Sequence, residues 1–406
     1  MARKKKDKSQ ERREALAELV TSVNSSKDST VICLASSIVN TSDVRRPTGI
    51  MPLDLDMAGG FPTAGITVVT GDDQAGKSEL IAYAMEMCQR IYGSESMILL
   101  CATEGPIDID RLRQVGVQWA LPPNVVAARN EARQRSRLPP LTQEEIGTTV
   151  GEIMHAYSST GEGVLKTILK AVEANCFQLV ILDSLSPLIP EANKDKDLTD
   201  EEKRAAHASM LTRFSNRFLE KVSPVRGPNY TSVVFTQQMR ANQEKANAPS
   251  YMQGYIPSTA PTGARALKHA VKMRIKLSEG QKLKKVVRGE KKVIGKLMKW
   301  EFLKAKDGAH NHITGDVPFY FGEHGTPDGV HRLNTVVEAG LRWAVLRERD
   351  DGKSSGIYFA NGDKERLADT IPDLLCSMRE DPILELRIRQ AILGARGLMV
   401  RYDFRP

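Results

Sequence analysis

The chain has 406 residues, enough for one large domain with appendages or for two or three domains, and its composition is that of a globular protein. Lys and Arg exceed Asp and Glu by 58 to 50, which gives a formal charge of +8 and a mild bias towards polyanionic partners. Five cysteines without a CxxC pair argue against a disulfide framework or a zinc ribbon. No apolar run approaches the roughly 18 residues of a membrane span, so we expect a cytoplasmic protein.

The N-terminal segment begins with a basic run and continues as a helix. Within the expected helix Arg12–Val23, the apolar residues from Leu16 onward fall at helical spacing and form a narrow stripe. A helix this short needs a partner surface to be stable. Residues 1–45 are therefore interpreted as this helix and a linker.

The middle of the chain, residues 46–325, alternates short apolar runs with helical segments. Such alternation predicts an α/β fold with a mostly parallel sheet and helices on both faces. The expected core strands are Ile66–Thr70, Met97–Ala102, Leu179–Leu182 and Ser232–Phe235.

Two other regions follow different patterns. Residues 128–159 are polar, contain Pro139-Pro140 and predict an insertion on the surface. Beyond residue 326 the elements are short, and helical segments are expected at Asp363–Met378 and Asp381–Ala395. Residues 326–406 therefore predict a small C-terminal α+β domain.

A phosphate-binding loop follows the first core strand. Gly71–Ser78 matches GxxxxGK[ST] and leads into a helical run, Glu79–Tyr92, which is the context that this motif requires. Glycines let backbone N–H groups wrap phosphates, Lys77 reaches the β- and γ-phosphates, and the Ser78 hydroxyl ligates Mg²⁺. ATP and Mg²⁺ are thus the expected cofactors. The loop residues expected to contact them are Gly71, Asp72, Asp73, Gln74, Ala75, Gly76, Lys77 and Ser78.

Two core strands end in carboxylates. Asp183 closes the strand that begins at Leu179, at the edge where a doubly wound sheet binds ligands, and is the expected acid on the Mg²⁺ side. Glu104 follows Met97–Ala102 in the same way and is expected to orient the attacking water. The alternative interpretation of Asp183 is a strand-end cap, and that of Glu104 is an ordinary surface acid. Their order after the phosphate-binding loop favours catalysis.

The order of motifs resembles that of the bacterial RecA recombinase family, which has archaeal, eukaryotic and phage relatives. The matching segments are Arg45–Asp54, Gly59–Pro62, Gly71–Ser78, Glu104–Val117, Thr160–Glu162, Asp183-Ser184, Phe235–Arg240, Thr262–Lys268 and Lys304–Lys306. The resemblance implies a RecA-like P-loop ATPase core, an N-terminal helix that docks on a neighbouring protomer in a filament, and a C-terminal domain that guides duplex DNA. Basic segments near Lys282–Arg288 and Lys296–Lys299 are expected to help that domain. The implied activity is strand exchange between single-stranded and homologous double-stranded DNA, with DNA-stimulated ATP hydrolysis.

The resemblance also implies roles for single residues. Gln238 resembles the strand-end sensor of the γ-phosphate, and Lys304 and Lys306 resemble a pair that reaches the γ-phosphate held by the adjacent protomer. Arg111 stands where the family has an aromatic residue that stacks on adenine, and a guanidinium also stacks on a base.

DNA binding is implied for two loops, Pro190–Lys203 and Met239–Pro261, where basic groups meet phosphates and apolar side chains stack on bases. The residues expected to contact DNA are Arg204, Arg240, Lys245, Tyr251, Met252 and Tyr255.

Two other functions fit the same core. A non-catalytic paralogue that caps filaments is one, although Lys77, Ser78, Glu104, Asp183 and Gln238 are all present. A ring helicase is the other, although the N-terminal helix and the C-terminal domain favour a filament. The longer second loop and the segment 128–159 depart from the family pattern and indicate a divergent or phage-encoded member.

Overall fold

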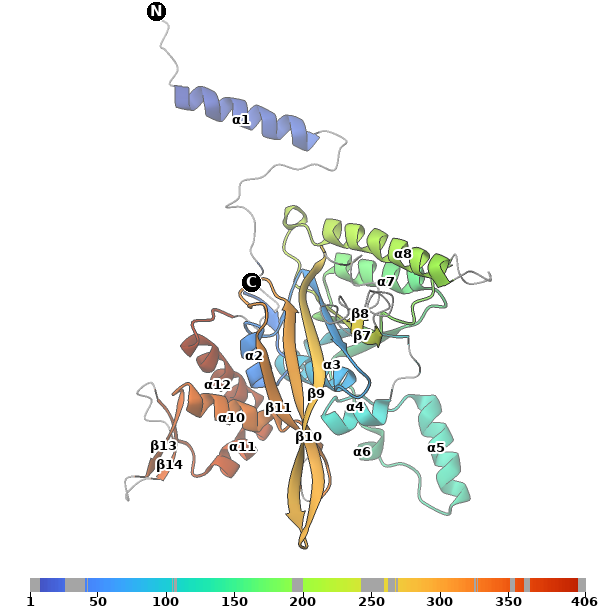
Figure 1. Cartoon of the computed structure of the whole chain (residues 1–406), viewed down its shortest axis with the longest axis vertical. Coiled ribbons are helices and arrows are strands. Elements are labelled where there is room, and N and C mark those ends of the chain that lie inside the picture. Colours follow the sequence, from blue (N-terminus) through green and yellow to red (C-terminus); the bar gives the residue numbers. More distant parts are fainter. Residues whose placement is uncertain are drawn as a thin grey trace, which may run out of the picture.

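A large mixed sheet forms the centre of the molecule in this computed structural model, which describes residues 8–25, 41, 43–103, 105, 108–191, 200–241, 259–261, 267, 269–324, 326, 328–350, 355–360 and 366–400. Its strands are β3 (Gly65–Gly71), β4 (Met97–Ala102), β5 (Glu152–Ala156), β6 (Leu179–Asp183), β7 (Ser232–Ala241), β8 (Thr259–Pro261), β9 (Val271–Val287), β10 (Glu290–Lys304), β11 (Thr314–Phe321) and β12 (Asp328–Gly329). The order is β12-β11-β10-β9-β3-β7-β6-β4-β5, with β8 paired to β7 (Figure 1). The strands from β9 to β5 in this order are parallel, and β10, β11, β12 and β8 pair antiparallel.

The expected α/β class and all four expected core strands are confirmed. Every residue of β3 is buried, because helices cover both faces of the parallel part of the sheet and leave no polar side to the strand. The expected strand Ser232–Phe235 is the first part of the longer strand β7.

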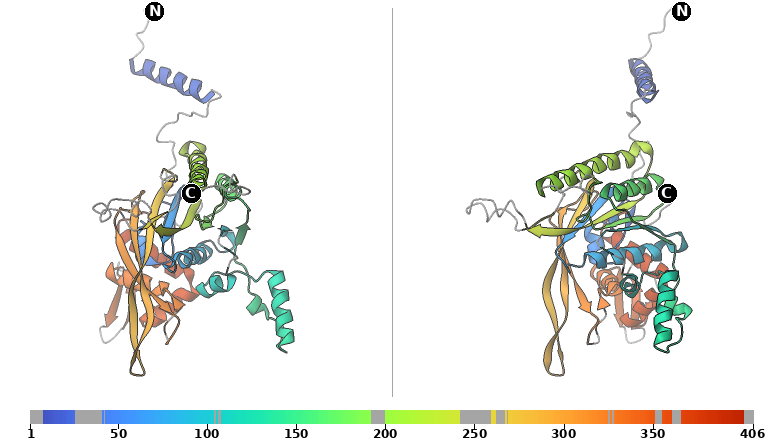
Figure 2. Two further views of the ribbon diagram at one scale, coloured as in Figure 1. Left: turned by 45° about the vertical axis from the view of Figure 1, so that its right-hand side comes forward. Right: turned by 90° about the vertical axis from the view of Figure 1, so that its right-hand side faces the viewer.

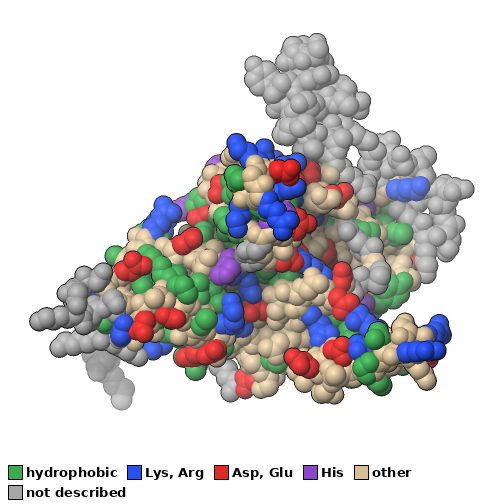
Figure 3. Space-filling model, turned by 90° about the horizontal axis from the view of Figure 1, so that it is seen from below, with side chains coloured by type: hydrophobic (Ala, Val, Ile, Leu, Met, Phe, Trp, Pro, Cys, Tyr) green, Lys and Arg blue, Asp and Glu red, His purple; other side chains and the backbone are tan. Residues whose placement is uncertain are grey.

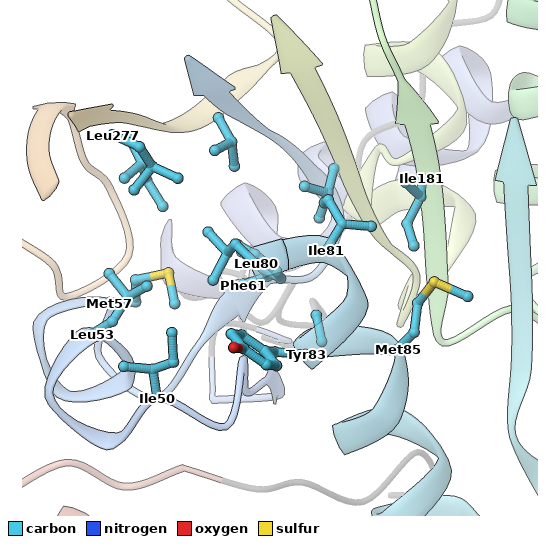
Figure 4. Close-up of a cluster of buried hydrophobic side chains, with 14 of the residues drawn as sticks. Ile50, Leu53, Met57, Phe61, Leu80, Ile81, Tyr83, Met85, Ile181 and Leu277 are labelled. Carbon is cyan, nitrogen blue, oxygen red and sulfur yellow. The ribbon is translucent and has the colours of Figure 1, made fainter. Parts of the chain in front are cut away.

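Helices pack on the two faces of this sheet in separate cores. Helix α3 (Lys77–Tyr92) lies on one face with α2 (Met51–Asp56), and Figure 4 shows Leu80, Ile81 and Met85 of α3 pointing into that core. Helices α7 (Gly161–Ala174) and α8 (Asp200–Lys221) share the core on the other face. The shorter elements near this body are β1 (Arg45–Arg46), β2 (Phe61–Pro62), α4 (Ile109–Val115) and the 3-10 helices Gly93–Glu95 and Pro224–Arg226.

The segment 128–159 is only partly the surface insertion that its composition predicts. Helices α5 (Pro123–Arg135) and α6 (Gln143–Ile146) contain no buried residue and extend outward from the body (Figure 1). However, Glu152–Ala156 is strand β5, which pairs parallel with β4 and ends the main sheet. The prediction was wrong there because an edge strand with one solvent side carries no continuous apolar run.

The C-terminal region has its own small sheet and a separate core, to which Met51 of α2 also contributes. The elements are α10 (Arg332–Arg342), β13 (Leu346–Asp350), β14 (Ser355–Phe359), β15 (Arg366–Ala368), α11 (Ile371–Glu380) and α12 (Pro382–Ala395). The helix expected over Asp363–Met378 was wrong at its start, since Arg366–Ala368 is a strand. Helix α11 begins only after Thr370, whose hydroxyl accepts from the Asp373 N–H at 3.3 Å and caps the first turn.

Helix α1 (Lys8–Ser25) is longer than expected and stands apart from the rest of the described chain (Figures 1 and 2). Leu16 and Leu19 on its apolar stripe are 50% and 51% exposed. None of the described helices is both long enough and apolar enough to cross a membrane.

Candidate nucleotide-binding site

The loop between β3 and α3 has the geometry of a phosphate-binding loop. Gly76 caps α3 with a positive φ of 94°, and a Cβ at this position would lie 2.9 Å from the Met298 sulfur. A Cβ on Gly71 would lie 2.7 Å from the Leu277 carbonyl oxygen. The Lys77 ammonium donates to the carbonyl oxygens of Gly71 at 2.9 Å and Asp72 at 2.7 Å, so it lies within the curve of the loop.

Asp183 lies beside this loop at the carboxyl edge of the sheet. Its Oδ2 accepts from the Ser78 hydroxyl at 3.4 Å, and its Oδ1 accepts from the hydroxyl of Thr236 on β7. Gln238 is two residues further along β7, so its side chain is on the same face as that of Thr236. Gln238 is also the register partner of Gly71. The structure therefore places Ser78, Asp183 and Gln238 at the same edge of the sheet.

Arg111 is held beside the first turn of α3 by two carboxylates. Its Nε donates to Glu79 Oε1 at 2.5 Å, and its Nη1 donates to Asp328 of β12. Burial lowers the pKa of Arg111, but the hydrogen bonds that Arg111 donates to Asp328 and Glu79 outweigh it and raise the pKa above its usual value. The two carboxylates thus occupy edges of the guanidinium, and only its flat faces remain for stacking on a base. Its contact with adenine stays a prediction.

Two cavities flank the start of α3. One, of about 290 Å³, is lined by Gln74–Glu79 together with Lys296 and Met298 of β10 and Phe319 and Phe321 of β11. The other, of about 380 Å³, is lined by Ser78, Glu79, Asp108, Arg111 and Asp183 among others. A nucleotide whose phosphates lie in the loop thus has room on either side for its base.

Sequence reasoning missed several of these residues. Thr236 is predictable from the sequence, because side chains alternate along a strand and Thr236 is therefore on the same face as Gln238. No local pattern predicts Lys296, Phe319 and Phe321, because only the long-range pairing of β10 and β11 brings them to the loop.

Lys304 and Lys306 lie away from the loop of their own chain. In the strand register Lys304 pairs with Arg274 of β9, and Arg274 pairs with Val68 of β3. Val68 lies three residues before Gly71. This separation is roughly 10 Å along the strand direction. Because β10 runs antiparallel to β9, the chain from Lys304 to Lys306 leads further from the loop.

The expected DNA contacts are mostly beyond what the structure describes. Glu104, Lys245, Tyr251, Met252 and Tyr255 lie outside the described residues, as do the side chains of Arg204 and Arg240. The ends of the second loop are described. There β8 pairs antiparallel with the last residues of β7, Met239 to Ala241, so the two-stranded stem of this loop begins directly after Gln238. Arg204 belongs to the beginning of α8.

One face of α3 binds the C-terminal region through polar groups at helical spacing. The Tyr83 hydroxyl accepts from the Val330 N–H at 2.7 Å, and Glu86 pairs with Arg332. One turn further on, Arg90 pairs with Glu385 of α12 at 2.6 Å. The helix that starts at the phosphate-binding loop is thus joined along its length to the C-terminal region.

Arg389 of α12 completes this network, and its side chain is 0% exposed. Its Nε pairs with Glu385 at 2.8 Å, its Nη1 lies 3.4 Å from Asp54 of α2, and its Nη2 donates to the Gly49 carbonyl at 2.7 Å. Burial raises the pKa of Asp54 to about 6, which leaves this carboxylate ionised at pH 7. The six residues Asp54, Glu86, Arg90, Arg332, Glu385 and Arg389 are termed the anchor below.

The chain is similar in sequence to known proteins. The RecA N-terminal domain family matches residues 132–324, a range that begins after the phosphate-binding loop. Protein RecA of Oleidesulfovibrio alaskensis is 22% identical over 388 residues, which cover 95% of this chain and 93% of that protein. Protein RecA of Bacillus subtilis is 24% identical over 353 residues, 87% of this chain and 83% of that protein.

A mixed α/β sheet with a phosphate-binding loop, a strand-end aspartate and a strand-end glutamine at one edge defines the class of the RecA-like P-loop core. The matched domain and the relatives narrow the resemblance, because the chain is similar to proteins of the RecA family over most of its length.

Proposed function

We propose that this protein is an ATP-dependent DNA recombinase that forms a helical filament on single-stranded DNA and pairs that strand with a homologous duplex. The observation that carries the proposal is the meeting of Lys77, Ser78, Asp183 and Gln238 at one edge of the sheet, where β7 leads into the second expected DNA loop. Similarity to the RecA family supports it.

The loop fits ATP and Mg²⁺ by its own chemistry. Backbone N–H groups at the start of α3 and the Lys77 ammonium provide positive charge for phosphates, and Ser78 with Asp183 provides oxygen ligands. Within the described residues no three His, Cys, Asp or Glu side chains form a metal site. Mg²⁺ therefore needs phosphate oxygens and water as further ligands, as is usual for this ion. When bound, ATP supplies a phosphoanhydride bond whose hydrolysis releases ADP and phosphate.

Gln238 and Thr236 give the site a route to the DNA loop. Thr236 fixes the Asp183 carboxylate, and Gln238 on the same face lies next to the phosphate-binding loop. Contact between Gln238 and the γ-phosphate would therefore be transmitted along β7, because the last residues of β7 form the stem of the loop. Glu104 is proposed as the acid that orients the attacking water.

We further propose that Lys304 and Lys306 complete the ATP site of an adjacent protomer. Their distance from the loop of their own chain supports a role in the neighbour. Positive charge then reaches the transition state only when a neighbour is docked, so hydrolysis depends on assembly.

The proposed function is tested by measuring ATP turnover with and without single-stranded DNA. We expect DNA to stimulate turnover and Lys77→Ala to reduce it more than about a hundredfold, because a loss of roughly 3 kcal/mol of transition-state stabilisation has this effect. Retention of more than about a tenth of the rate would refute the assigned role of Lys77. Negative-stain images with an ATP analogue should show helical filaments, and closed rings would favour the helicase instead.

Mixing experiments test the role of the lysine pair. Lys304→Ala/Lys306→Ala protein and Lys77→Ala protein should each be inactive, since each lacks one half of the shared site. Filaments that contain both should regain part of the activity, at interfaces where an intact loop faces intact lysines. If mixed filaments stay inactive, the lysines do not act in the neighbouring protomer.

A further inference from the structure

The chain turns sharply after Lys304 and Lys306. Strand β10 ends at Lys304, and Asp307 and Gly308 both have positive φ, 58° and 92°. Consecutive residues in this conformation form tight turns, and aspartate adopts it more readily than most side chains that have a Cβ. Residues 304–307, which contain both lysines, are termed the lysine segment.

Asp307 fixes the end of the lysine segment to two other parts of the chain. Its carbonyl oxygen accepts from Arg45 Nη2, and its carboxylate forms an ion pair with the Lys272 ammonium at 2.7 Å. Only 24% of the Asp307 side chain and 25% of the Lys272 side chain are exposed, so salt screens this pair less than a surface pair. Inside the segment, the Ala305 N–H donates to Asn311 Oδ1 at 2.6 Å, across the turn.

The two cations that contact Asp307 have fixed places in the body of the molecule. Arg45 is 2% exposed and belongs to β1, which pairs with β2. Burial lowers the pKa of Arg45, and the charge of Asp307 is the largest that opposes this effect. Lys272 of β9 also donates to the Thr63 carbonyl oxygen at 3.0 Å. Its side chain crosses Gly65 so closely that a Cβ there would lie 2.3 Å from the Lys272 Cδ.

Lys306 differs from the residues on either side of it. Its side chain is exposed, and among the residues that the structure describes it forms no ion pair, whereas Ala305 and Asp307 are hydrogen-bonded. Lys and Arg side chains also lie on the face seen from the tip of β9 and β10 (Figure 3), at the other end of β10 from Lys304. Positive charge alone therefore does not distinguish the lysine segment, whereas its fixed backbone does.

We propose that Asp307 is a positioning residue, which holds Lys304 and Lys306 in place for ATP hydrolysis in the adjacent protomer. Ordering a long lysine side chain costs conformational entropy, and a displacement of about 1 Å in a catalytic site costs roughly a hundredfold in rate. A backbone that is fixed before the neighbour docks removes part of both costs. This inference rests on the proposed role of the two lysines in the neighbour.

The test places Asp307→Asn on one side or the other of a mixed interface. Lys77→Ala protein supplies the lysines but has no active loop, and Lys304→Ala/Lys306→Ala protein supplies the loop but no lysines. Asp307→Asn is added to either protein, which is then mixed with its unaltered counterpart on single-stranded DNA. ATP turnover of the mixed filaments is compared with that of the two parent proteins, and capture through a tag on one protein verifies that the filaments contain both.

We expect Asp307→Asn to lower the recovered turnover about tenfold when Lys77→Ala protein carries it, because the lysines that face the intact loop are then displaced. In Lys304→Ala/Lys306→Ala protein the same change should have no effect, because no lysine remains there to be positioned. Asp316→Asn in Lys77→Ala protein is the matched control. It removes the same charge from an exposed residue of β11 and should leave the turnover unchanged.

Two outcomes would overturn the inference. One is full recovery when Lys77→Ala protein carries Asp307→Asn, and the other is an equal loss in both placements, which would assign Asp307 to folding or assembly. If circular dichroism shows that Asp307→Asn protein does not fold, Lys272→Gln takes its place and should give the same one-sided loss. If the parent mixture recovers no activity although DNA stimulates the wild-type ATPase, the proposed role of the lysines fails, and this inference fails with it. Recovery by the parents confines any failure to Asp307.

Discussion

The anchor differs in the placement of its charges from residues 281–293, where β9 and β10 pair only with each other beyond the main sheet and which are termed the basic ribbon. In the anchor, Asp54 and Arg389 are 0% exposed and Glu385 is 2% exposed, and each has more than one polar partner. In the ribbon, the side chains of Lys284 and Lys291 are exposed, and within the described part of the chain they form no ion pair.

This difference separates charges that fix the structure from charges that are available to a ligand. A buried charge is costly to remove from water, so it is tolerated only with partners in good geometry, and loss of one partner leaves the other uncompensated. An exposed lysine loses little when it is replaced, and its interactions are screened by salt. The anchor therefore sets how the C-terminal region sits on α3, whereas the charges of the ribbon remain exposed to solvent.

The largest expected effect is on the anchor. Arg389→Ala should lower the free energy of unfolding by about 3–5 kcal/mol, because Asp54 and Glu385 lose their shared cation in a buried site. Arg387→Ala is the matched control, since Arg387 is an exposed arginine of the same helix that lies over the Phe359 ring. It should cost about 1 kcal/mol or less. Denaturant unfolding followed by circular dichroism measures both, and equal losses would contradict the contrast between buried and exposed charges.

A smaller effect should appear in acid. Burial alone raises the pKa of Glu385, but Arg389 and Arg90 outweigh it and hold the pKa below its ordinary value of 4.5. A carboxylate with a lowered pKa in the folded state adds stability above its unfolded pKa and loses it as the pH falls through the folded one. The stability difference between wild type and Glu385→Gln should be complete near neutral pH and shrink below about pH 4.5. Thermal unfolding over a pH series checks this, and a constant difference in acid would exclude an ionised Glu385 as its source.

Much of this fold could be predicted because buried parallel strands have continuous apolar sequences. Strand β4 was predicted to the residue, and β3 and β6 to within one residue at each end. Strand β5 was not predicted, because its residues are half exposed and no run marks them. Strand β15 has three residues and precedes a helix, so it was merged with that helix.

In the candidate site, too, residues marked by a local pattern could be predicted and residues joined by long-range pairing could not. Lys77, Ser78 and Asp183 are close together and were recognised, because a motif and a strand end are local signals. The pairing of Arg111 with Asp328 spans 217 residues, and the anchor pairing of Arg389 with Asp54 spans 335. Only the folded register brings such residues together, so no local pattern predicts them. The charge of the ribbon was visible in the sequence, whereas its projection from the sheet was not.

The smallest expected effect is on the ribbon itself, where replacing a lysine should help folding slightly. Lys285 lies directly opposite Lys292, and this repulsion is present only when both carry charge. Lys285→Gln keeps a donor for the His324 carbonyl oxygen, to which Lys285 donates at 3.3 Å, and removes the repulsion. We expect the amides of residues 281–293 to exchange with solvent about twofold more slowly in the variant at low salt. In about 1 M salt the Debye length falls to roughly 3 Å, and the two proteins should then exchange alike. Slower exchange that persists in high salt would show that packing, and not charge, limits the ribbon.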